Sequence, residues 1–352
     1  MYERIPFKQR GERLEGAQHK EDISMRRVTQ GLLIGLVVVM MCTVYAEAQE
    51  HKLIFGGSDA VGSLLDRANR KFIELFEAKS DGKVKVSFYP ADQLGGDIDQ
   101  IQSTMAGTQH LYGDVLVWLA NWMPDFNILG WGFTFRDKDH LYNFLRSDLY
   151  KGMIAEFEKE YDVKILSAVP TQPRILFSKN PVNSLEDIED VKMRVPEIES
   201  YLRLWEALGT RPTRVTWSEV YMALKQGVID ACEGPVSAAY AAKMHEPTGN
   251  VTATNHLMST YFIMMNGAMF DSLGPELQQK AYEAAEEATQ FMYDESDRET
   301  QETYDKMEEE GANVIRSIDV GPWQEKVRDA TAAMEEKGLW RKGLWEEIQA
   351  IE

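Results

Sequence analysis

Residues 52–89 of the chain read KLIFGGSDAVGSLLDRANRKFIELFEAKSDGKVKVSFY, and this stretch decides the fold class. Residues 52–56 form an apolar run that predicts a strand, and the apolar positions over 64–76 fall on one face of a helix. The apolar residues of 84–88 alternate with polar ones, which predicts a half-buried strand that stops at Pro90. A strand, a helix and a second strand in this order indicate an α/β domain with a largely parallel sheet.

The alternation of strands and helices continues and predicts a second α/β domain. Thr216 and Glu219 fit a capping box, followed by a helix that runs to Gln226 and stops at Gly227. The other expected elements are a helix over 97–106 and strands over 114–119, 174–178, 192–195, 228–231 and 261–266.

Residues 276–310 contain no glycine or proline and are rich in Ala, Glu, Gln and Lys. At 1.5 Å per residue, an unbroken helix of roughly 35 residues is about 50 Å long. Because that exceeds the width of either domain, we expect this helix to cross both. A coiled-coil arm is the alternative, but the apolar positions do not keep a clean heptad.

Length and charge narrow the function. The chain has 352 residues, which is too long for one ordinary hydrophobic core and suits two domains. It carries 38 Lys and Arg against 57 Asp and Glu, a formal net charge of -19. Such a surface repels nucleic acid phosphates and anionic lipids, so neither is an expected partner. Any anion site must therefore be built locally from a few arginines.

The N-terminal residues are typical of an export signal. The basic pair Arg26-Arg27 precedes an apolar run over 31–44, and Ala46-Glu47-Ala48 supplies the small residues that a signal peptidase needs. The run is shorter than the ~20 residues of a membrane-spanning helix. We therefore expect a leader over 1–48, cleavage near Ala48 and a periplasmic protein.

Common motifs of catalysis and metal binding are missing from the sequence. It holds no H-E-x-x-H, C-x-x-C or G-x-S-x-G motif, and Ser63 stands where a phosphate-binding loop that begins at Gly57 would need a lysine. After removal of the leader a single cysteine remains, Cys232, for which core packing is the expected role. We expect no enzymatic activity, no metal and no other cofactor.

Two arginines lie within predicted strands. Arg174 follows Pro173, and Arg194 lies inside the segment KMRVP over 192–196. Burying a guanidinium without a partner is costly, and its planar fork matches a carboxylate through two hydrogen bonds. The partner is either the carboxylate of a bound anion or an acidic side chain in a structural salt bridge. The residues alone leave both possibilities open.

The stretch from Arg174 to Pro235 resembles the extracytoplasmic binding proteins of tripartite ATP-independent periplasmic (TRAP) transporters. The likeness extends over nearly the whole mature chain, including the long helix, and it is specific because several pieces occur together at this spacing. These pieces are RILFS (174–178), NSLED (183–187), KMRVP (192–196), WSEVYMALKQG (217–227) and VIDACEGP (228–235), with GKVKV (82–86) and YPADQLG (89–95) upstream.

The resemblance implies a two-domain α/β periplasmic binding protein, type II-like, with hinge strands and a long domain-spanning helix. It implies a domain I over 49–172 plus 260–299 and a domain II over 173–259 plus 300–352, which close on a ligand between them. It also implies that a monomer binds a small organic-acid anion and delivers it to the small and large permease subunits of a TRAP transporter.

Three site residues follow from the most specific pieces of the resemblance. In this family the arginine of the K-[IM]-R-x-P piece, here Arg194, makes a bidentate salt bridge to the ligand carboxylate. The family's second arginine corresponds to Arg174 and assists. An aromatic residue before S-E-V-Y covers the ligand, and that position is Trp217.

Five further residues are expected at the ligand on weaker grounds. Glu233 belongs to the D-x-x-E piece, and some members carry Asn at the next position, where Gly234 of this chain lacks the donor and leaves more room. Trp118 adds a candidate wall of the pocket. Ser58 and Asp97 follow predicted strands, where contacts from the first domain would fall.

Other functions remain open from the sequence. The same fold could present ligand occupancy to a signalling receptor, which a neighbouring gene for a sensor kinase would favour. A ligand that is not an acid is a further alternative. An exported enzyme would need a nucleophile or a metal cluster that the sequence does not display.

Overall fold

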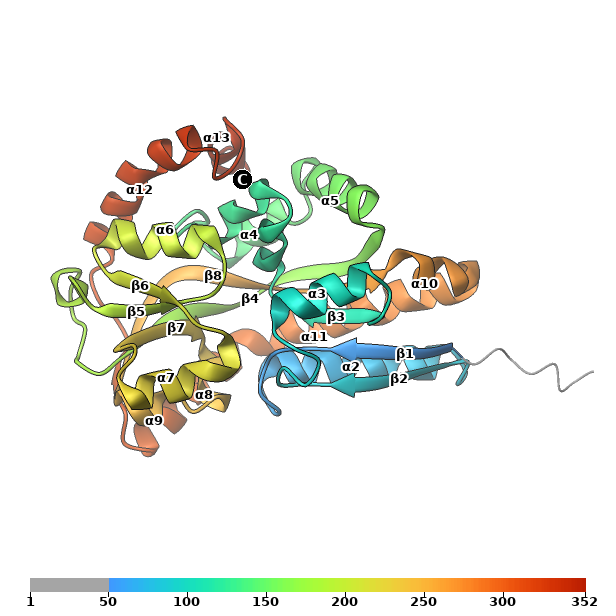
Figure 1. Ribbon diagram of the computed structural model, residues 1–352, viewed down its shortest axis with the longest axis horizontal. Helices are drawn as coiled ribbons and strands as arrows, with labels where there is room; N and C mark the ends of the chain where they lie inside the picture. Colours follow the sequence, from blue (N-terminus) through green and yellow to red (C-terminus); the bar gives the residue numbers. More distant parts are fainter. Residues whose placement is uncertain (1–50) are drawn as a thin grey trace, which may run out of the picture. The chain divides into compact units, whose positions relative to one another are not determined.

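The computed structural model describes residues 51–352, and the predicted leader with its cleavage site near Ala48 lies outside them. In the described part of the chain, nine strands form one sheet of order β2-β1-β3-β8-β4-β7-β5-β6, with β9 beside β8 (Figure 1). The strands are β1 (His51–Gly56), β2 (Val84–Tyr89), β3 (Leu111–Asp114), β4 (Val163–Ser178), β5 (Lys192–Val195), β6 (Arg211–Arg214), β7 (Ala231–Pro235), β8 (Asn250–Asn266) and β9 (Asn313–Ile315).

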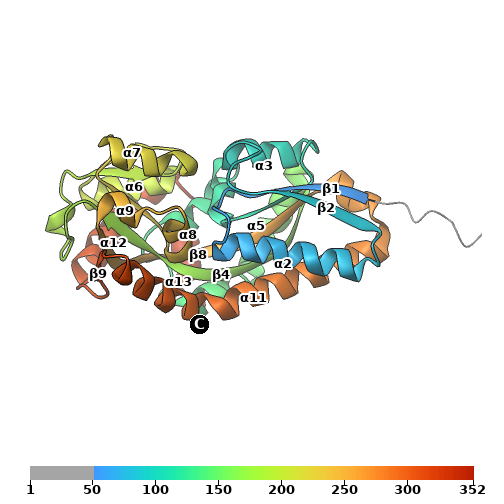
Figure 2. The same cartoon turned by 90° about the horizontal axis from the view of Figure 1, so that it is seen from below.

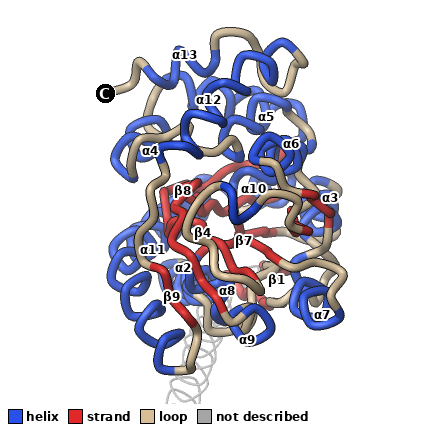
Figure 3. Tube along the Cα trace, turned by 90° about the vertical axis from the view of Figure 1, so that its left-hand side faces the viewer, coloured by secondary structure: helices blue, strands red, loops and turns tan. Residues whose placement is uncertain are grey.

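Helices lie around this sheet on both of its faces (Figure 3). Over residues 51–352, no helix is both long enough and apolar enough to cross a membrane. The helices are α2 (Leu64–Lys79), α3 (Asp97–Met105), α4 (Lys138–Phe144), α5 (Asp148–Tyr161), α6 (Glu199–Leu208), α7 (Val220–Gln226), α8 (Val236–Ala241), α9 (His245–Thr248), α10 (Gly267–Ser272), α11 (Gly274–Glu309), α12 (Gly321–Glu336) and α13 (Leu344–Gln349), with short 3-10 helices η1 (Leu116–Asn121), η2 (Pro124–Gly130), η3 (Glu186–Ile188) and η4 (Trp217–Glu219).

The strand–helix–strand unit predicted from the first stretch is confirmed. β1 pairs in parallel with β2, and α2 connects them. The hydroxyl of Ser63 caps α2 by accepting a hydrogen bond from the Asp66 amide. The apolar face of the helix, including Phe72 and Phe76, is fully buried, which fits the predicted amphipathic pattern.

The sheet is parallel at its two ends and antiparallel in its centre. β1 is parallel to β2 and β3, and β5 is parallel to β6 and β7. Between these groups, β8 runs antiparallel to β3 and β4, and β4 runs antiparallel to β7. The expectation of a largely parallel sheet therefore holds for the ends and is wrong for the centre, where the two longest strands carry the chain from one end of the sheet to the other.

Irregular pairing explains why the sequence indicated only part of β4. The register of β4 against β8 shifts between Pro170 and Pro173 and again between Arg174 and Leu176. Proline cannot donate to the ladder and is tolerated in a central strand only at such irregularities. On the partner strand, Asn255 is exposed and has a φ of 45°, a left-handed conformation that asparagine adopts more easily than most residues.

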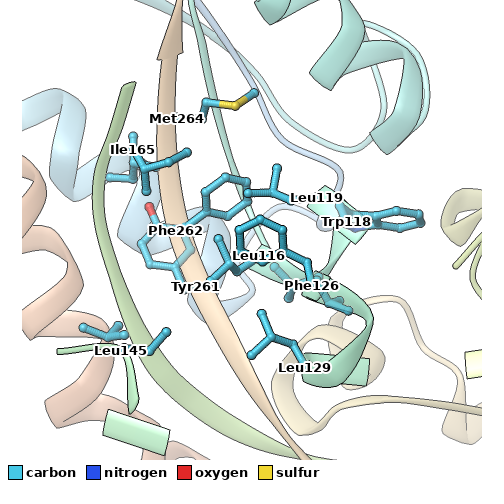
Figure 4. Packing of buried hydrophobic residues seen from close by; sticks show 14 of the residues in the cluster. Leu116, Trp118, Leu119, Phe126, Leu129, Leu145, Ile165, Tyr261, Phe262 and Met264 are labelled. Atoms are coloured by element: carbon cyan, nitrogen blue, oxygen red, sulfur yellow. The ribbon is translucent and has the colours of Figure 1, made fainter. Parts of the chain in front are cut away.

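The predicted strand over 114–119 is wrong, because η1 occupies Leu116–Asn121. The Asp114 carboxylate accepts a hydrogen bond from the Val115 amide at 2.7 Å, and the backbone leaves the sheet there. Apolar side chains of η1 then pack against Phe262 of β8 (Figure 4). A short apolar run is buried equally well inside a sheet or against its face, so periodicity alone could not separate the two.

Two further local predictions need correction. The strand expected over 228–231 begins only at Ala231, because Gly227 takes the left-handed conformation and the Val228 amide still donates to the Ala223 carbonyl of α7. This helix C-cap uses the residues that were assigned to the strand. The capping box at Thr216 is also wrong, since its side chain makes no capping hydrogen bond and η4 precedes α7.

The long helix is confirmed as α11, with 36 residues. It runs along the sheet and contacts both α2 and α8, which belong to opposite ends of the sheet (Figure 2). Its buried residues include small ones such as Ala284, Ala285 and Ala288, which let the helix approach its neighbours closely. The division of the chain into two domains, with the boundaries given above, stays a prediction.

Candidate functional site

A cavity of about 40 Å³ lies where parallel strands end. β1 leads into Ser58 and Asp59, β3 ends at Asp114, β5 carries Arg194 and β7 ends at Pro235, and all five residues line the cavity. Open α/β sheets bind ligands in the crevice outside the carboxyl ends of their strands. The central pair β8 and β4 separates β1 and β3 from β5 and β7 in the sheet, so the cavity gathers residues from both of its ends.

Arg194 is buried in β5, with 2% of its surface exposed. Its Nε atom donates a hydrogen bond to the Val215 carbonyl at 2.8 Å, and its guanidinium carbon lies 5.3 Å from the centre of the Trp217 ring. Burial lowers the pKa of Arg194, although an arginine keeps its proton in proteins. Within residues 51–352 Arg194 has no ion pair, so this buried cation is available to an anion in the cavity.

Arg174 also lines the cavity, but its fork is occupied. Its Nε and Nη2 atoms donate to the two carboxylate oxygens of Glu233 at 2.5 and 2.7 Å. Burial alone would raise the pKa of Glu233, yet the attraction of Arg174 lowers it to about 2. The remaining Nη1 atom lies 3.5 Å from the hydroxyl of Ser259. The structural salt bridge that the sequence left open is therefore present at Arg174.

The Arg174–Glu233 pair is held by further buried side chains. The guanidinium of Arg174 lies 5.1 Å from the centre of the Tyr201 ring. His256, which is fully buried, places Nε2 3.3 Å from Glu233 and Nδ1 2.8 Å from the Thr254 hydroxyl. Burial lowers the pKa of His256 despite its acidic neighbour. These contacts join β4, β7, β8 and α6 beneath the cavity.

Three carboxyl groups form the part of the cavity wall that comes from the other end of the sheet. Asp59, Asp97 and Asp114 are 9%, 5% and 5% exposed. Asp97 accepts a hydrogen bond from the Tyr112 hydroxyl at 2.6 Å, and Asp59 accepts one from the Ser63 hydroxyl at 3.2 Å. Burial raises the pKa of Asp59 to about 7 and that of Asp97 to about 6, and it raises the pKa of Asp114 well above its ordinary value.

Aromatic side chains close the cavity. Trp217, Trp118 and Tyr201 all line it, and Trp118 points away from its neighbours in η1 (Figure 4). Gly234 leaves room for Trp217, since a Cβ atom at position 234 would lie 2.8 Å from the indole. Such apolar faces exclude water and strengthen the few polar contacts of a ligand.

The structure brings most of the predicted site residues together. Glu233 and Gly234 do not line the cavity. Glu233 pairs with Arg174, and Gly234 packs against Trp217. Sequence reasoning missed Asp59 and Asp114, although Asp59 directly follows Ser58 at the end of a predicted strand. The predicted residues that line the cavity are Arg194, Arg174, Trp217, Trp118, Ser58 and Asp97.

Reactive chemistry is not evident around this cavity. Over residues 51–352, no group of three or more His, Cys, Asp or Glu residues is placed to hold a metal ion. Cys232 is buried in the core, as the sequence predicted, and burial raises the pKa of its thiol to about 12. A protonated thiol is a weak nucleophile.

Known proteins share this fold and about a quarter of the aligned residues. The 2,3-diketo-L-gulonate-binding periplasmic protein of Escherichia coli (strain K12) is 27% identical over 84% of this chain and 90% of its own. A TRAP periplasmic solute-binding protein from Roseobacter denitrificans, solved with bound β-D-glucuronate, is 25% identical with a TM-score of 0.80, covering 86% of this chain and 100% of its own. A similar protein from Sulfurospirillum deleyianum, solved with bound succinate, has 23% identity and a TM-score of 0.80, covers 86% of this chain and 99% of its own, and shows the fold alone.

The family comparison extends over most of the described chain. The profile described as bacterial extracellular solute-binding protein, family 7, matches residues 55–337. This range includes every strand but the start of β1, and it includes all residues of the cavity. The chain therefore belongs to family 7 of the bacterial extracellular solute-binding proteins and is a periplasmic solute-binding protein of the TRAP type, not an enzyme.

Proposed function

We propose that this protein binds a small organic-acid anion through Arg194 and delivers it to the small and large permease subunits of a TRAP transporter. One observation carries the proposal: Arg194 is a buried cation that lines the cavity and has no ion pair within residues 51–352. Burying a charge without a partner is strongly unfavourable. A ligand carboxylate would supply that partner, and the guanidinium fork matches it through two hydrogen bonds.

The relatives support an acid as the ligand. The Escherichia coli relative is a 2,3-diketo-L-gulonate-binding protein, and the Roseobacter protein was solved with glucuronate. Both molecules are sugar acids with a carboxylate that an arginine can hold. In this chain the group that could hold such a carboxylate is the buried guanidinium of Arg194, beside the ring of Trp217.

Ligand binding would close two domains around the cavity. The proposed domain I covers 49–172 plus 260–299, and domain II covers 173–259 plus 300–352. In this division β4 and β8 would pass from one domain to the other, and the irregular pairing near Pro170 and the left-handed Asn255 would supply positions where these strands bend. A ligand shifts such an open–closed equilibrium only by its greater affinity for the closed form.

The same proposal includes export through the N-terminal signal, cleavage near Ala48 and a monomeric receptor. Expression of the full chain in a bacterial host, followed by purification from the periplasm and N-terminal sequencing, would test the export step. A mature protein that begins at Gln49 is expected. Retention of residues 1–48 on the purified protein would contradict the predicted cleavage.

Thermal unfolding and calorimetric titration with a panel of organic acids test the ligand class. A ligand at a hundred times its Kd adds about 2.7 kcal/mol to the free energy of unfolding, which raises Tm by several degrees. Arg194→Lys keeps the charge but loses the fork, so binding should weaken by roughly tenfold or more. Arg214→Lys is the matched control, because Arg214 is exposed and lies on the neighbouring strand β6. Equal affinities of the two variants would contradict the role of Arg194.

A further inference from the structure

The cavity is electrostatically asymmetric. Arg194 lines it from β5, whereas Asp59, Asp97 and Asp114 line it from the opposite end of the sheet order. The other guanidinium at the cavity, that of Arg174, is committed to Glu233. One cation therefore remains for a ligand, together with three carboxyl groups for which no cation is within ion-pair distance among residues 51–352.

The carboxyl groups receive hydrogen bonds but are not saturated. A hydroxyl donates to Asp59, another donates to Asp97, and the Val115 amide donates to one oxygen of Asp114. The second carboxylate oxygen of Asp114 is buried and has no hydrogen-bond partner within the described residues. Buried polar atoms without partners are rare in folded proteins. Such an atom on a residue that lines a cavity points to a hydrogen-bond partner supplied by the ligand.

On the basis of the proposed function, we propose that the ligand is a monocarboxylate that carries hydroxyl groups on the part farther from Arg194, and that the acidic wall rejects a second carboxylate. A second carboxylate would bring a negative charge to a surface that already holds three carboxyl groups, of which the ionised ones are negative as well. Like charges repel strongly where water is excluded. A single carboxylate already satisfies the free cation.

Hydroxyl groups suit this wall better than an ammonium group does. Burial raises the pKa values of all three carboxyl groups, so some of them hold a proton near neutral pH. A protonated carboxyl needs an acceptor and an ionised one needs a donor. A hydroxyl group fills both roles, whereas an ammonium group can only donate.

Matched pairs of acids test this proposal by isothermal titration calorimetry at pH 8, where Asp59 and Asp97 are largely ionised. Each pair has one carbon skeleton and differs only in a terminal hydroxymethyl or carboxylate group: erythronate with meso-tartrate, galactonate with galactarate, and gluconate with glucarate. Succinate and γ-aminobutyrate provide a short dicarboxylate and an ammonium ligand. We expect at least one hydroxylated monocarboxylate to bind, with an affinity at least tenfold above that of its dicarboxylate partner and above those of succinate and γ-aminobutyrate.

The variant Asp97→Asn tests which group rejects the second carboxylate. In this variant the ratio of the affinities for the monocarboxylate and the dicarboxylate of a pair should fall at least fivefold. The reason is that the substitution removes an ionised carboxyl and leaves the shape of the side chain nearly unchanged. Asp99→Asn is the matched control, since Asp99 is exposed in the same turn of α3. Circular dichroism and Tm of both variants without ligand establish that they fold.

Each outcome decides the proposal. Dicarboxylates that bind as tightly as their hydroxylated partners, or γ-aminobutyrate that binds more tightly than every hydroxylated acid, would overturn it. If Asp97→Asn prefers monocarboxylates over dicarboxylates as strongly as Asp99→Asn does, the acidic wall is not the cause of the preference. If those dicarboxylates or γ-aminobutyrate still lose affinity in Arg194→Lys, the proposed acid receptor stands and only the ligand assignment fails. If no acid binds at all, the proposed function itself fails.

Discussion

The indole of Trp217 occupies the space in front of Gly234, so closely that a Cβ atom on the glycine would come within 2.8 Å of its ring. The guanidinium of Arg194 lies over the same indole, with its central carbon 5.3 Å from the ring centre. The absence of a side chain at position 234 thus fixes the aromatic wall, which in turn supports the cation that we assign to the ligand. A glycine whose φ is ordinary is needed here for space rather than for backbone conformation.

Gly234→Ala should weaken ligand binding by roughly tenfold, because the methyl group forces the indole of Trp217 to shift, and overpacking of this kind typically costs about 1–3 kcal/mol. Calorimetric titration measures the affinity, and tryptophan fluorescence reports the displaced indole. Gly152→Ala is the control, since nothing lies within 4 Å of a Cβ atom there and the residue is inside α5. Equal ligand affinities of both variants would show that Trp217 accommodates the added methyl group without disturbing the ligand site.

Glu233→Gln should destabilise the fold much more than the same substitution at an exposed glutamate. Both partners of the Arg174–Glu233 pair are buried, with side-chain exposures of 6% and 0%. Removing one member of a buried pair leaves an uncompensated charge, at a cost of about 3–5 kcal/mol. Urea unfolding measures the loss of free energy of unfolding.

Glu206→Gln provides the comparison for this change, because Glu206 pairs with Arg203 at the surface. Surface pairs contribute about 0–1 kcal/mol. A Glu233→Gln protein as stable as the Glu206→Gln protein would mean that Arg174 finds another partner, and it would make Arg174 a candidate for direct contact with the ligand.

The sequence predicted those parts of the fold that depend on local pattern. The amphipathic α2 and the uninterrupted α11 have long, regular signals, and both are confirmed. β4 and β8 were only partly predicted, since prolines and bulges interrupt the alternation that identifies a strand. Whether an apolar run such as that of η1 lies in the sheet or on it is decided by tertiary packing, which the local sequence does not contain.

The sequence identified the arginines of the site more readily than the acids. Arg194 was found because a guanidinium inside a strand needs a partner, and a family resemblance then assigned one. Asp59 and Asp114 carry no such signal, since aspartates beside strand ends are common in turns and caps. Their closeness arises only from the parallel pairing of β1 with β3. This pairing was not predictable from local sequence, because more than fifty residues separate β1 from β3 in the chain.

Ala288→Leu tests the close packing of α11 against the sheet. Ala288 is fully buried in α11, which contacts β4 and α2. Extra methylene groups in a packed core typically cost about 1–3 kcal/mol, so Tm should fall by several degrees. Ala332→Leu places the same side chain on the exposed face of α12 and should leave Tm nearly unchanged. If both variants unfold at the temperature of the parent protein, α11 is not packed tightly against the sheet.

The acidic wall should make stability depend on pH, and Asp97→Asn should remove the contribution of Asp97 to that dependence. Burial raises the pKa of Asp97 to about 6, whereas an aspartate in an unfolded chain titrates near 3.9. Between these values the folded protein holds a proton that the unfolded chain has released. Asp97 therefore contributes its full stabilisation below about pH 4, and that contribution is lost as the pH rises through about 6. The charged and titratable groups that act on it are Asp59, Asp92, Asp114, Tyr112 and Arg194.

Urea unfolding of the parent protein and Asp97→Asn at pH 4.5, 6.0 and 7.5 measures this effect as a difference between the two free energies of unfolding. Because asparagine does not titrate, the parent protein should lose stability relative to the variant as the pH increases. Asp99→Asn in the same helical turn corrects for the general loss of one negative charge. A difference that stays constant from pH 4.5 to 7.5, or that changes in the opposite direction, would mean that Asp97 is ionised throughout this range. The cavity would then face its ligand with a permanent negative charge, which favours an ammonium group over a hydroxyl group at that wall.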